Sequence, residues 1–293
     1  GIFVIVGGFM LYSILKFKAK PGDDELPDQS HDGTQLEIGL MVVSAILVAV
    51  IAVPNVKLLY KLAEPPRGSN PLQVNVIGHQ YWWEFEIPEY QIATANEFKI
   101  PIGRPIEFNV SSVDVIHSFW VPRLGGKVDA VPGRDNYLWF QADQEGWYSG
   151  QCAELCGSSH AKMKFEVHAV NDEEFLAWVE KEAAPAEQPI TELAKEGKDL
   201  FLTKMCITCH AVKGYDGAIG ITGPNLSHFG SRRKLAGMWV ENTKDNLEDW
   251  LGDPASFKPD NIMALQGPMY IDDKFALTRD EIEKLAAYLK ELY

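Results

Sequence analysis

An uncharged apolar stretch near the N-terminus constrains this chain most, because few folds can accommodate it in water. Residues 38–56 (IGLMVVSAILVAVIAVPNV) contain no charged side chain, and their length approaches the ~20 apolar residues that a helix needs to cross a bilayer. Pro54 near the end is tolerated in membrane helices. Residues 1–15 are also uncharged but fewer. A secretory signal would explain that stretch alone, but a second stretch so soon afterwards favours a two-helix transmembrane hairpin over residues 1–65.

Basic residues between the two stretches predict the orientation of the hairpin. Lys16, Lys18 and Lys20 follow the first stretch, and loops rich in lysine and arginine stay on the cytoplasmic side. The chain after the second stretch is therefore expected outside. The sequence begins with Gly1 rather than methionine, so we expect a further segment upstream.

The remaining sequence predicts a β-domain followed by a helical one. Short runs rich in β-branched and aromatic residues, separated by turn residues, predict a small all-β sandwich or barrel; they are residues 72–77, 81–87, 105–111, 136–140, 146–149 and 162–170. A helix over 172–183 and a linker over 184–189 follow. Helices are then expected at 191–205, 247–251 and 279–292, the last with Thr278 and Glu281 as a capping box. The predicted boundaries are 70–183 for the β-domain and 190–293 for the helical domain.

The charge balance excludes one class of partner. The chain has 27 basic and 41 acidic residues, for a net charge of −14. A nucleic-acid-binding protein needs a basic face to replace phosphate counterions. An acidic surface suits a basic protein partner, or serves solubility alone.

The segment Cys152–Met163 (CAELCGSSHAKM) gathers soft metal ligands. Cys152, Cys156, His160 and Met163 lie within twelve residues. A blue-copper site uses one cysteine, two histidines and a weak axial methionine, so one thiolate is in surplus, and two coppers bridged by both sulfurs would use it. His117, upstream, is the candidate second imidazole. A zinc site, which accepts two cysteines and two histidines, and a disulfide remain as alternatives.

A second motif, Cys206-Ile-Thr-Cys209-His210, is the C-x-x-C-H pattern of covalent haem attachment. The two thiols would add to the haem vinyl groups, and the adjacent His210 would ligate the iron. A thioredoxin-like redox pair is the alternative for C-x-x-C, but the histidine and the helical surroundings disfavour it.

Residues 1–180 resemble subunit II of cytochrome c oxidase. The matching segments are residues 78–85 (GHQYWWEF), 117–122 (HSFWVP), 124–134 (LGGKVDAVPGR) and 152–163. The resemblance implies a cupredoxin domain with the binuclear copper centre CuA. It implies as ligands His117, Cys152, Cys156, His160, Met163 and the backbone carbonyl of Glu154, whose carboxylate would face a magnesium site shared with subunit I.

Residues 190–293 resemble a class I cytochrome c, an all-α domain. In Thr222-Gly-Pro-Asn-Leu226, Pro224 would accept a hydrogen bond from the ring of His210 and orient it. A methionine is expected as the sixth iron ligand. Met263 in KPDNIM matches the family pattern; Met269 and Met238 are the alternatives.

Other residues carry weaker signals. Tyr81 stands where the family has an electron-accepting tryptophan, so a surface tryptophan route is in doubt, and residues 81–83 (YWW) fit core packing as well. Glu37 is either an interfacial charge or the entrance of a proton pathway, as the resemblance implies. Four histidines lack neighbouring ligands and are expected to be ordinary polar residues: His31, His79, His168 and His228.

The domain order resembles bacterial caa-type oxidases, in which a cytochrome c is fused to subunit II. Electrons would pass from a reduced carrier, such as a cytochrome c, to haem c, to the copper pair and to haem in subunit I. Oxygen reduction and proton pumping would occur in subunit I, so this chain alone would catalyse nothing. Subunits I and III and the lipid bilayer are the expected partners, with the metal domains on the outer face of the bacterial cytoplasmic membrane. A copper subunit of a nitric oxide reductase and a membrane-anchored electron carrier are the alternatives.

Overall fold

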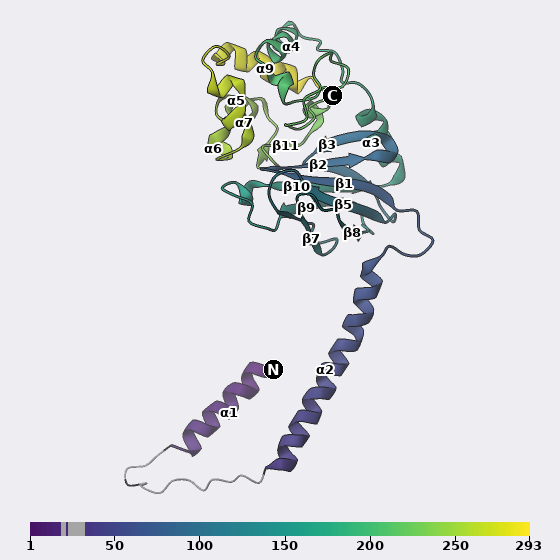
Figure 1. Ribbon diagram of the computed structural model, residues 1–293, viewed down its shortest axis with the longest axis vertical. Coiled ribbons are helices and arrows are strands. Elements are labelled where there is room, and N and C mark those ends of the chain that lie inside the picture. The colour runs from purple at the N-terminus through teal and green to yellow at the C-terminus, as the bar shows by residue number, and fades with distance from the viewer. Residues whose placement is uncertain (19–21, 23–32) are drawn as a thin grey trace. The chain divides into compact units, whose positions relative to one another are not determined.

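The computed structural model describes residues 1–18, 22 and 33–293 (Figure 1). The chain divides into two compact units, residues 1–59 and residues 60–293. Lys20, predicted as part of a cytoplasmic loop, and His31, predicted to be an ordinary polar residue, lie outside the described residues.

The N-terminal unit consists of apolar helices. α2 (Thr34–Ala63) contains Pro54, buries no residue and has a mean hydropathy of 2.7 in its most apolar window. Its 30 residues are more than the ~20 that a bilayer requires. α1 (Ile2–Lys16) has only 15 residues, and a helix of that length rises about 22 Å, less than the ~30 Å hydrocarbon core. One helix of the described residues is therefore long enough to span a membrane, and the predicted two-helix hairpin is not established.

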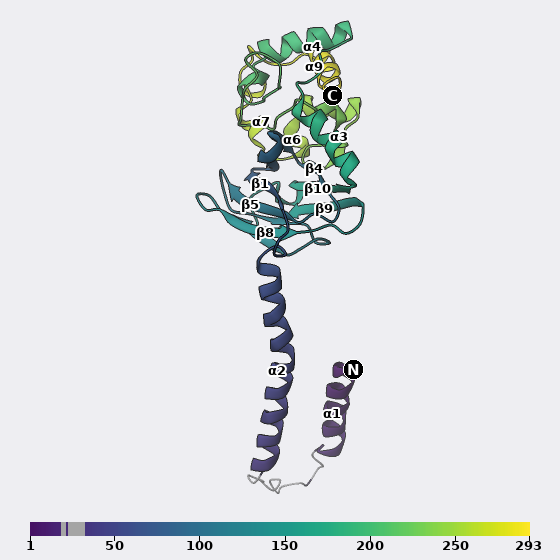
Figure 2. The same cartoon turned by 90° about the vertical axis from the view of Figure 1, so that its right-hand side faces the viewer.

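Residues 72–170 form the predicted β-sandwich. One sheet has the order β3-β2-β1-β5-β8 and the other the order β4-β10-β9-β6-β7; Figure 2 shows strands of the two sheets side by side. The first sheet contains β1 (Leu72–His79), β2 (Trp82–Ile87), β3 (Ile92–Ala95), β5 (Ile106–Ser112) and β8 (Asn136–Phe140). The second contains β4 (Glu97–Pro101), β6 (His117–Trp120), β7 (Lys127–Ala130), β9 (Gly146–Cys152) and β10 (Lys164–Val170). β1 pairs with β5, and β4 with β10, in parallel; the other pairs are antiparallel.

Aromatic side chains fill the space between the two sheets. Alternate residues of β5 are buried, as expected for a strand with one face on a core. Phe119 and Phe165 stack with their ring centroids 4.8 Å apart, and Trp83 meets both edge-on. A side chain at Gly150 would lie 2.2 Å from the ring of Phe165, so the ring fits only because this residue has none.

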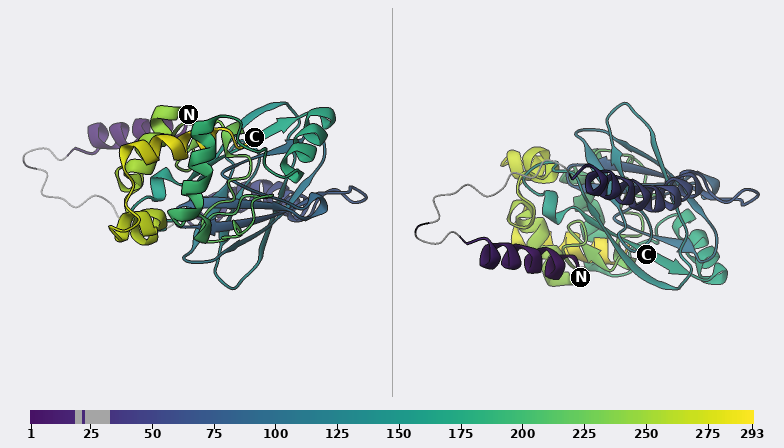
Figure 3. Two further views of the ribbon diagram at one scale, coloured as in Figure 1. Left: turned by 90° about the horizontal axis from the view of Figure 1, so that it is seen from above. Right: turned by 90° about the horizontal axis from the view of Figure 1, so that it is seen from below.

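Residues 172–293 are mainly helical. They form α3 (Asp172–Ala183), α4 (Glu192–Thr203), α5 (Lys244–Gly252), α6 (Pro254–Phe257), α7 (Ile262–Gln266), α8 (Pro268–Ile271) and α9 (Arg279–Lys290), with a two-stranded β11 (Lys234–Leu235) and β12 (Val240–Glu241). The helices from α4 to α9 gather on one side of the strands (Figures 1 and 3). The predicted capping box is present: Thr278 and Glu281 exchange backbone–side-chain hydrogen bonds of 2.8 and 3.3 Å.

The segment over residues 184–189 forms neither helix nor strand. Ala186 in this segment is buried, and its N–H donates to the carbonyl of Lys213 at 2.9 Å. The connection therefore packs against the helical domain along part of its length.

α4 and α9 cross closely at Gly197, and Figure 1 shows the two helices side by side. A Cβ atom at Gly197 would lie 2.0 Å from the backbone oxygen of Lys284 and 2.9 Å from the Cβ of Tyr288. Both contacts are far shorter than van der Waals distance, so glycine is required at this crossing.

We therefore expect Gly197→Ala to separate the two helices and to lower the free energy of unfolding by about 1–3 kcal/mol, the usual range for overpacking. Gly252→Ala is the matched control, because its Cβ would meet nothing closer than Ile282 at 3.8 Å. Denaturant titration of the full chain in detergent, followed by circular dichroism, measures both. Equal stability of the two variants would contradict the close crossing.

Candidate functional site

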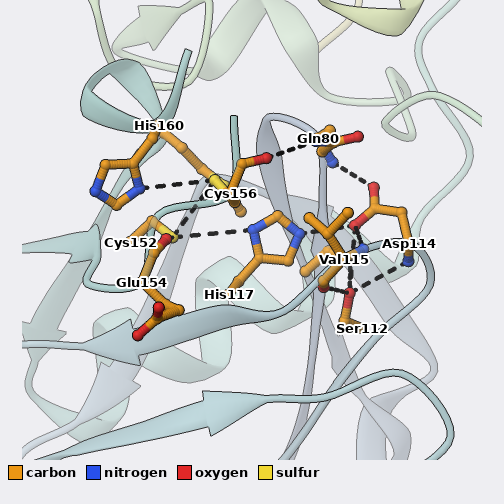
Figure 4. Close-up of polar contacts among 11 residues, drawn as sticks. Gln80, Ser112, Asp114, Val115, His117, Cys152, Glu154, Cys156 and His160 are labelled. Carbon is orange, nitrogen blue, oxygen red and sulfur yellow. Dashed lines mark hydrogen bonds and ion pairs between the residues drawn. The ribbon is translucent and has the colours of Figure 1, made fainter. Parts of the chain in front are cut away.

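Two thiols and an imidazole form a buried cluster at one end of the β-sandwich. Cys152 ends β9, Cys156 lies in the loop that follows, and His117 begins β6. The two sulfurs are 3.8 Å apart, and Cys152 Sγ lies 3.9 Å from His117 Nδ1. Figure 4 shows both sulfurs pointing into the space between the rings of His117 and His160. The cysteines are free thiols, so the disulfide alternative is wrong.

The other predicted donors surround the same two sulfurs. His160 Nδ1 lies 3.6 Å and Met163 Sδ 3.9 Å from Cys156 Sγ, and the carbonyl of Glu154 accepts a hydrogen bond from Cys152 Sγ at 3.2 Å. Donor atoms that share a metal at about 2.0–2.3 Å lie about 3–4 Å from one another. The structure thus brings all six predicted donor residues together at separations that suit metal binding.

A hydrogen bond closes the loop that carries these donors. The N–H of Cys152 donates to the carbonyl of Met163 at 3.0 Å. The first and last donors of the loop are therefore joined through their backbones. In between, the loop is short enough to turn both thiols and His160 inward.

Asp114 and Gln80 form hydrogen bonds that hold the cluster in place, and the sequence analysis did not predict either residue. His117 Nε2 lies 2.7 Å from Asp114 Oδ1, so its Nδ1 faces the sulfurs. Asp114 also accepts a hydrogen bond of 2.6 Å from the backbone N–H of Gln80, whose side-chain amide donates to the carbonyl of Cys156. An acidic residue three positions before a ligating histidine was the available signal, since such histidines usually bind a carboxylate through their other nitrogen.

The contacts within the cluster shift its proton affinities. The contact with Cys156 lowers the pKa of Cys152 well below the usual thiol range, whereas the contact with Cys152 and burial raise the pKa of Cys156. Burial alone would lower the pKa of His117, but the hydrogen bonds to Asp114 and Cys152 outweigh it and raise the pKa. The contact between the two thiols thus favours a single thiolate, and metal binding would require the second thiol to lose its proton as well.

The helical domain encloses a cavity lined by Cys206, Cys209, His210, Met263 and Met269. Its walls are mainly apolar side chains. The C-x-x-C-H motif, the proposed proximal loop and both favoured methionines thus border one space, although they are up to about sixty residues apart in sequence. Met238 is buried but does not line this cavity.

His210 is held as the predicted interaction requires. Its Nδ1 lies 2.8 Å from the carbonyl of Pro224, which leaves Nε2 free. Burial lowers the pKa of His210, so the ring is neutral and can ligate a metal. A Cβ at Gly223 would lie 2.6 Å from the ring, so the loop approaches the imidazole this closely because residue 223 is glycine.

Part of the cavity wall comes from the β-domain. Gln80, Tyr81 and Trp82 line it together with the helical residues. Tyr81 and Trp82 are buried, while Trp83 lies in the sandwich core. The core-packing interpretation therefore fits Trp83 and also Tyr81, which belongs to the sandwich core and borders the cavity as well, whereas Trp82 lies outside that core cluster.

The remaining singled-out residues stand apart from these sites. His79 bonds Glu84 at 3.0 Å, His168 stacks on Trp147, and His228 contacts the carbonyl of Ala184. None of the three belongs to the metal-ligand cluster found among the described residues. Glu37 is exposed in the first turn of α2.

Comparisons with known proteins bear on both sites. Residues 90–170 match the periplasmic domain of cytochrome c oxidase subunit II, and residues 194–293 match cytochrome c. The chain is 40% identical to cytochrome c oxidase subunit 2 of Alkalihalophilus pseudofirmus, over 99% of this chain and 82% of that protein. It is 39% identical to the subunit 2 of Bacillus sp. PS3, over 94% of this chain and 80% of that protein.

The chain belongs to the cytochrome c oxidase subunit II family. Among solved structures, the periplasmic domain of subunit II from Bradyrhizobium japonicum is similar, with 35% identity, a TM-score of 0.37, and coverage of 38% of this chain and 92% of that one. The predicted role is confirmed: this is the subunit through which electrons enter a cytochrome c oxidase, an oxidoreductase complex. The family domains imply copper and haem c as cofactors, and the nitric oxide reductase and free-carrier alternatives are not favoured.

Both Met263 and Met269 line the cavity and are candidates for the sixth haem ligand. Replacing each of them in turn distinguishes between the two. We expect Met263→Ala to abolish the sulfur-to-iron absorption band of the oxidised haem, because the iron loses its thioether. Met269→Ala should keep the band. Spectra of the two purified variants decide, and the reverse pattern would assign the ligand to Met269.

Proposed function

We propose that electrons enter this chain at a covalent haem c, pass to a two-copper centre, and leave to haem in subunit I, where oxygen is reduced and protons are pumped. The observation that carries the proposal is the position of residues 80–82. This segment lines the cavity of the helical domain and also contacts the loop that carries the thiols. A single stretch of backbone thus connects the two sites.

The arrangement of the six donors supports two coppers rather than one ion. His117 and the Glu154 carbonyl lie beside Cys152, whereas His160 and Met163 lie beside Cys156. The donors thus divide into two similar halves that share the pair of sulfurs. A single tetrahedral zinc would leave the thioether and the carbonyl unused, and thioether ligands favour copper. When bound, such a copper pair would accept and release one electron with little rearrangement of its ligands.

The chain's own residues would hold the haem in a defined way. Cys206 and Cys209 would bond its vinyl groups, His210 and Met263 would ligate the iron, and Pro224 would fix the His210 ring. Both thiols of the motif and the imidazole border the cavity, and burial raises the pKa of Cys206 to about 12.

Tyr81 supports a direct route from the haem cavity to the copper loop. Its hydroxyl lies so close to Gly157 that a Cβ there would be 2.4 Å away, and its ring is 4% exposed. Gly157 follows Cys156 directly. At the position where the family has an electron-accepting tryptophan, this chain therefore buries a tyrosine beneath its own cytochrome domain.

Contacts across the domain junction support docking of the fused donor in one orientation. Glu166 pairs with Arg233 at 2.9 Å and with Lys234 at 3.2 Å, and Ser159 Oγ donates to the carbonyl of Pro259 at 2.7 Å. Arg233 also lies over the ring of Trp147. A fused partner already acts at an effective concentration of order mM, and these contacts would add a preferred geometry to that advantage.

The proposal extends to the membrane arrangement. A two-pass hairpin with Lys16 and Lys18 on the cytoplasmic side would put both metal domains on the outer face of a bacterial membrane. Glu37 would then lie at the cytoplasmic end of α2, as a proton-path candidate. The Glu154 carboxylate would face a magnesium ion at the contact with subunit I, and subunit III and an upstream cytochrome c would complete the chain's partners.

Cys156→Ser tests the copper pair. Because both sulfurs would be shared, we expect the variant to lose the mixed-valence electron paramagnetic resonance signal while keeping its covalent haem. Metal analysis of the copper-loaded wild-type chain should give two coppers per chain. One copper, or zinc, would contradict the proposal.

His210→Ala tests the order of electron transfer. We expect oxygen consumption with natural donors to stop, because haem c would be the obligate donor, while the copper spectrum stays intact. Small artificial reductants that reduce copper directly should still support turnover, which serves as the control. Wild-type oxygen consumption with natural donors would make the fused haem a side branch, and turnover of nitric oxide but not oxygen would favour a reductase.

A further inference from the structure

Lys258 is a buried amine in the wall of the haem cavity. Its side chain is 3% exposed, and its ammonium group donates to the backbone carbonyl of Tyr81, across the domain junction. Among the described residues, no carboxylate forms an ion pair with it, and burial is the largest influence on its pKa. Lys258 therefore lacks the anionic partner that buried lysines normally have.

Burial without a carboxylate is unfavourable for an ammonium group. Burial lowers the pKa of Lys258 to about 7, because the charged form loses its water. Buried charges in proteins are generally paired. The structure gives the amine one backbone carbonyl as a partner, so an anionic group of a molecule in the cavity would stabilise its charged form.

The position of Lys258 is fixed by its surroundings, so the amine cannot readily reach water. The side chain of Asn261 donates hydrogen bonds to the carbonyls of Lys258 at 2.6 Å and of Pro254 at 3.0 Å. Lys258 Nζ also lies only 2.6 Å from where a Cβ of Gly237 would stand. Asn261 thus holds the backbone of Lys258, and Gly237 lies against its amine.

A second cation lines the same cavity. The guanidinium of Arg232 donates to the backbone carbonyl of Asn225, and burial lowers its pKa although Glu182 and Glu97 act from a distance. Lys234 lines the cavity as well but pairs with Glu166. Two partly satisfied cations in a mainly apolar cavity suit a ligand that is apolar in its body and anionic at one edge. A haem, with its two propionates, has this character.

We propose that Lys258 binds a haem propionate and joins it to the carbonyl of Tyr81, so that the carboxylate edge of the haem faces the copper domain. This inference rests on the proposed covalent haem. Lys258 would then be a positioning residue: one ammonium group would hold the cofactor and the β-domain segment at the same point. Because Met263 lies five residues further along the same segment, this contact would also steady the loop of the proposed axial ligand.

The test uses the purified oxidase complex with Lys258→Met, Lys258→Arg and Arg233→Met. Arg233 pairs with Glu166 across the same junction but does not line the cavity, so its variant controls for loosened docking. Haem staining on denaturing gels reports attachment. Resonance Raman spectra report the propionate bending mode, and a redox titration at the α band of haem c reports its potential.

We expect Lys258→Met to keep the covalent haem and the sulfur-to-iron band, while its propionate mode shifts and its potential falls. The potential falls because an unpaired carboxylate near the iron favours the ferric state. Lys258→Arg should restore most of both signals, and Arg233→Met should leave both at the wild-type values. If Lys258→Met takes up no haem, Lys258→Gln must show the same two shifts.

Wild-type Raman and redox values in haem-loaded Lys258→Met would overturn the inference and leave the proposed function intact. Equal shifts in Arg233→Met would overturn it as well, since domain loosening would then explain them. Absence of stainable haem in the wild-type chain would instead refute the proposed function, and the inference with it.

Discussion

The pairing of β6 with β9 is the constraint on which the cluster of Cys152, Cys156 and His117 depends. In this register Phe119 faces Cys152, so His117, two residues before Phe119, lies beside the thiol that ends β9. Gly78 on β1 completes the arrangement, because a Cβ there would lie 2.7 Å from the His117 ring. A shift of one residue in this register would turn His117 to the opposite face of its sheet. The Phe119 ring opposes such a shift, since it is buried in the core of the sandwich against the ring of Phe165 on β10.

The segment over residues 80–82 connects this cluster to the rest of the molecule. Gln80 bonds both Asp114, which orients His117, and the backbone of Cys156. Tyr81 contacts the copper loop through its hydroxyl and Lys258 through its carbonyl. The positions of the thiol loop and of the helical domain are therefore coupled through three consecutive residues. A change in how the helical domain docks would therefore shift the side chains of the thiol loop. A change in that loop would likewise alter the docking of the helical domain.

Much of this could be predicted from the sequence because the information was local. The donors Cys152 to Met163 and the motif at Cys206 to His210 are short, chemically specific patterns, and the structure brings their members together. The strands β3, β4, β6 and β7 fall outside the predicted runs, because each has only four or five residues. Gln80 and Lys258 act across 76 and 177 residues in sequence, and no periodicity or motif marks such contacts. Asp114 lies only three residues before His117, and this spacing was the one local signal that the prediction missed. The second membrane pass stays a prediction, since α1 alone is too short.

The distribution of charge explains how the helical domain can dock on the β-domain although the chain as a whole is acidic. The net charge of −14 would by itself oppose compact association. At the junction, however, the helical domain presents Arg233 and Lys234, and the β-domain presents Glu166, which is mostly buried. Partly buried pairs are screened less by salt than exposed ones, so local complementarity outweighs the long-range repulsion. These two cations are thus used at the junction between the domains.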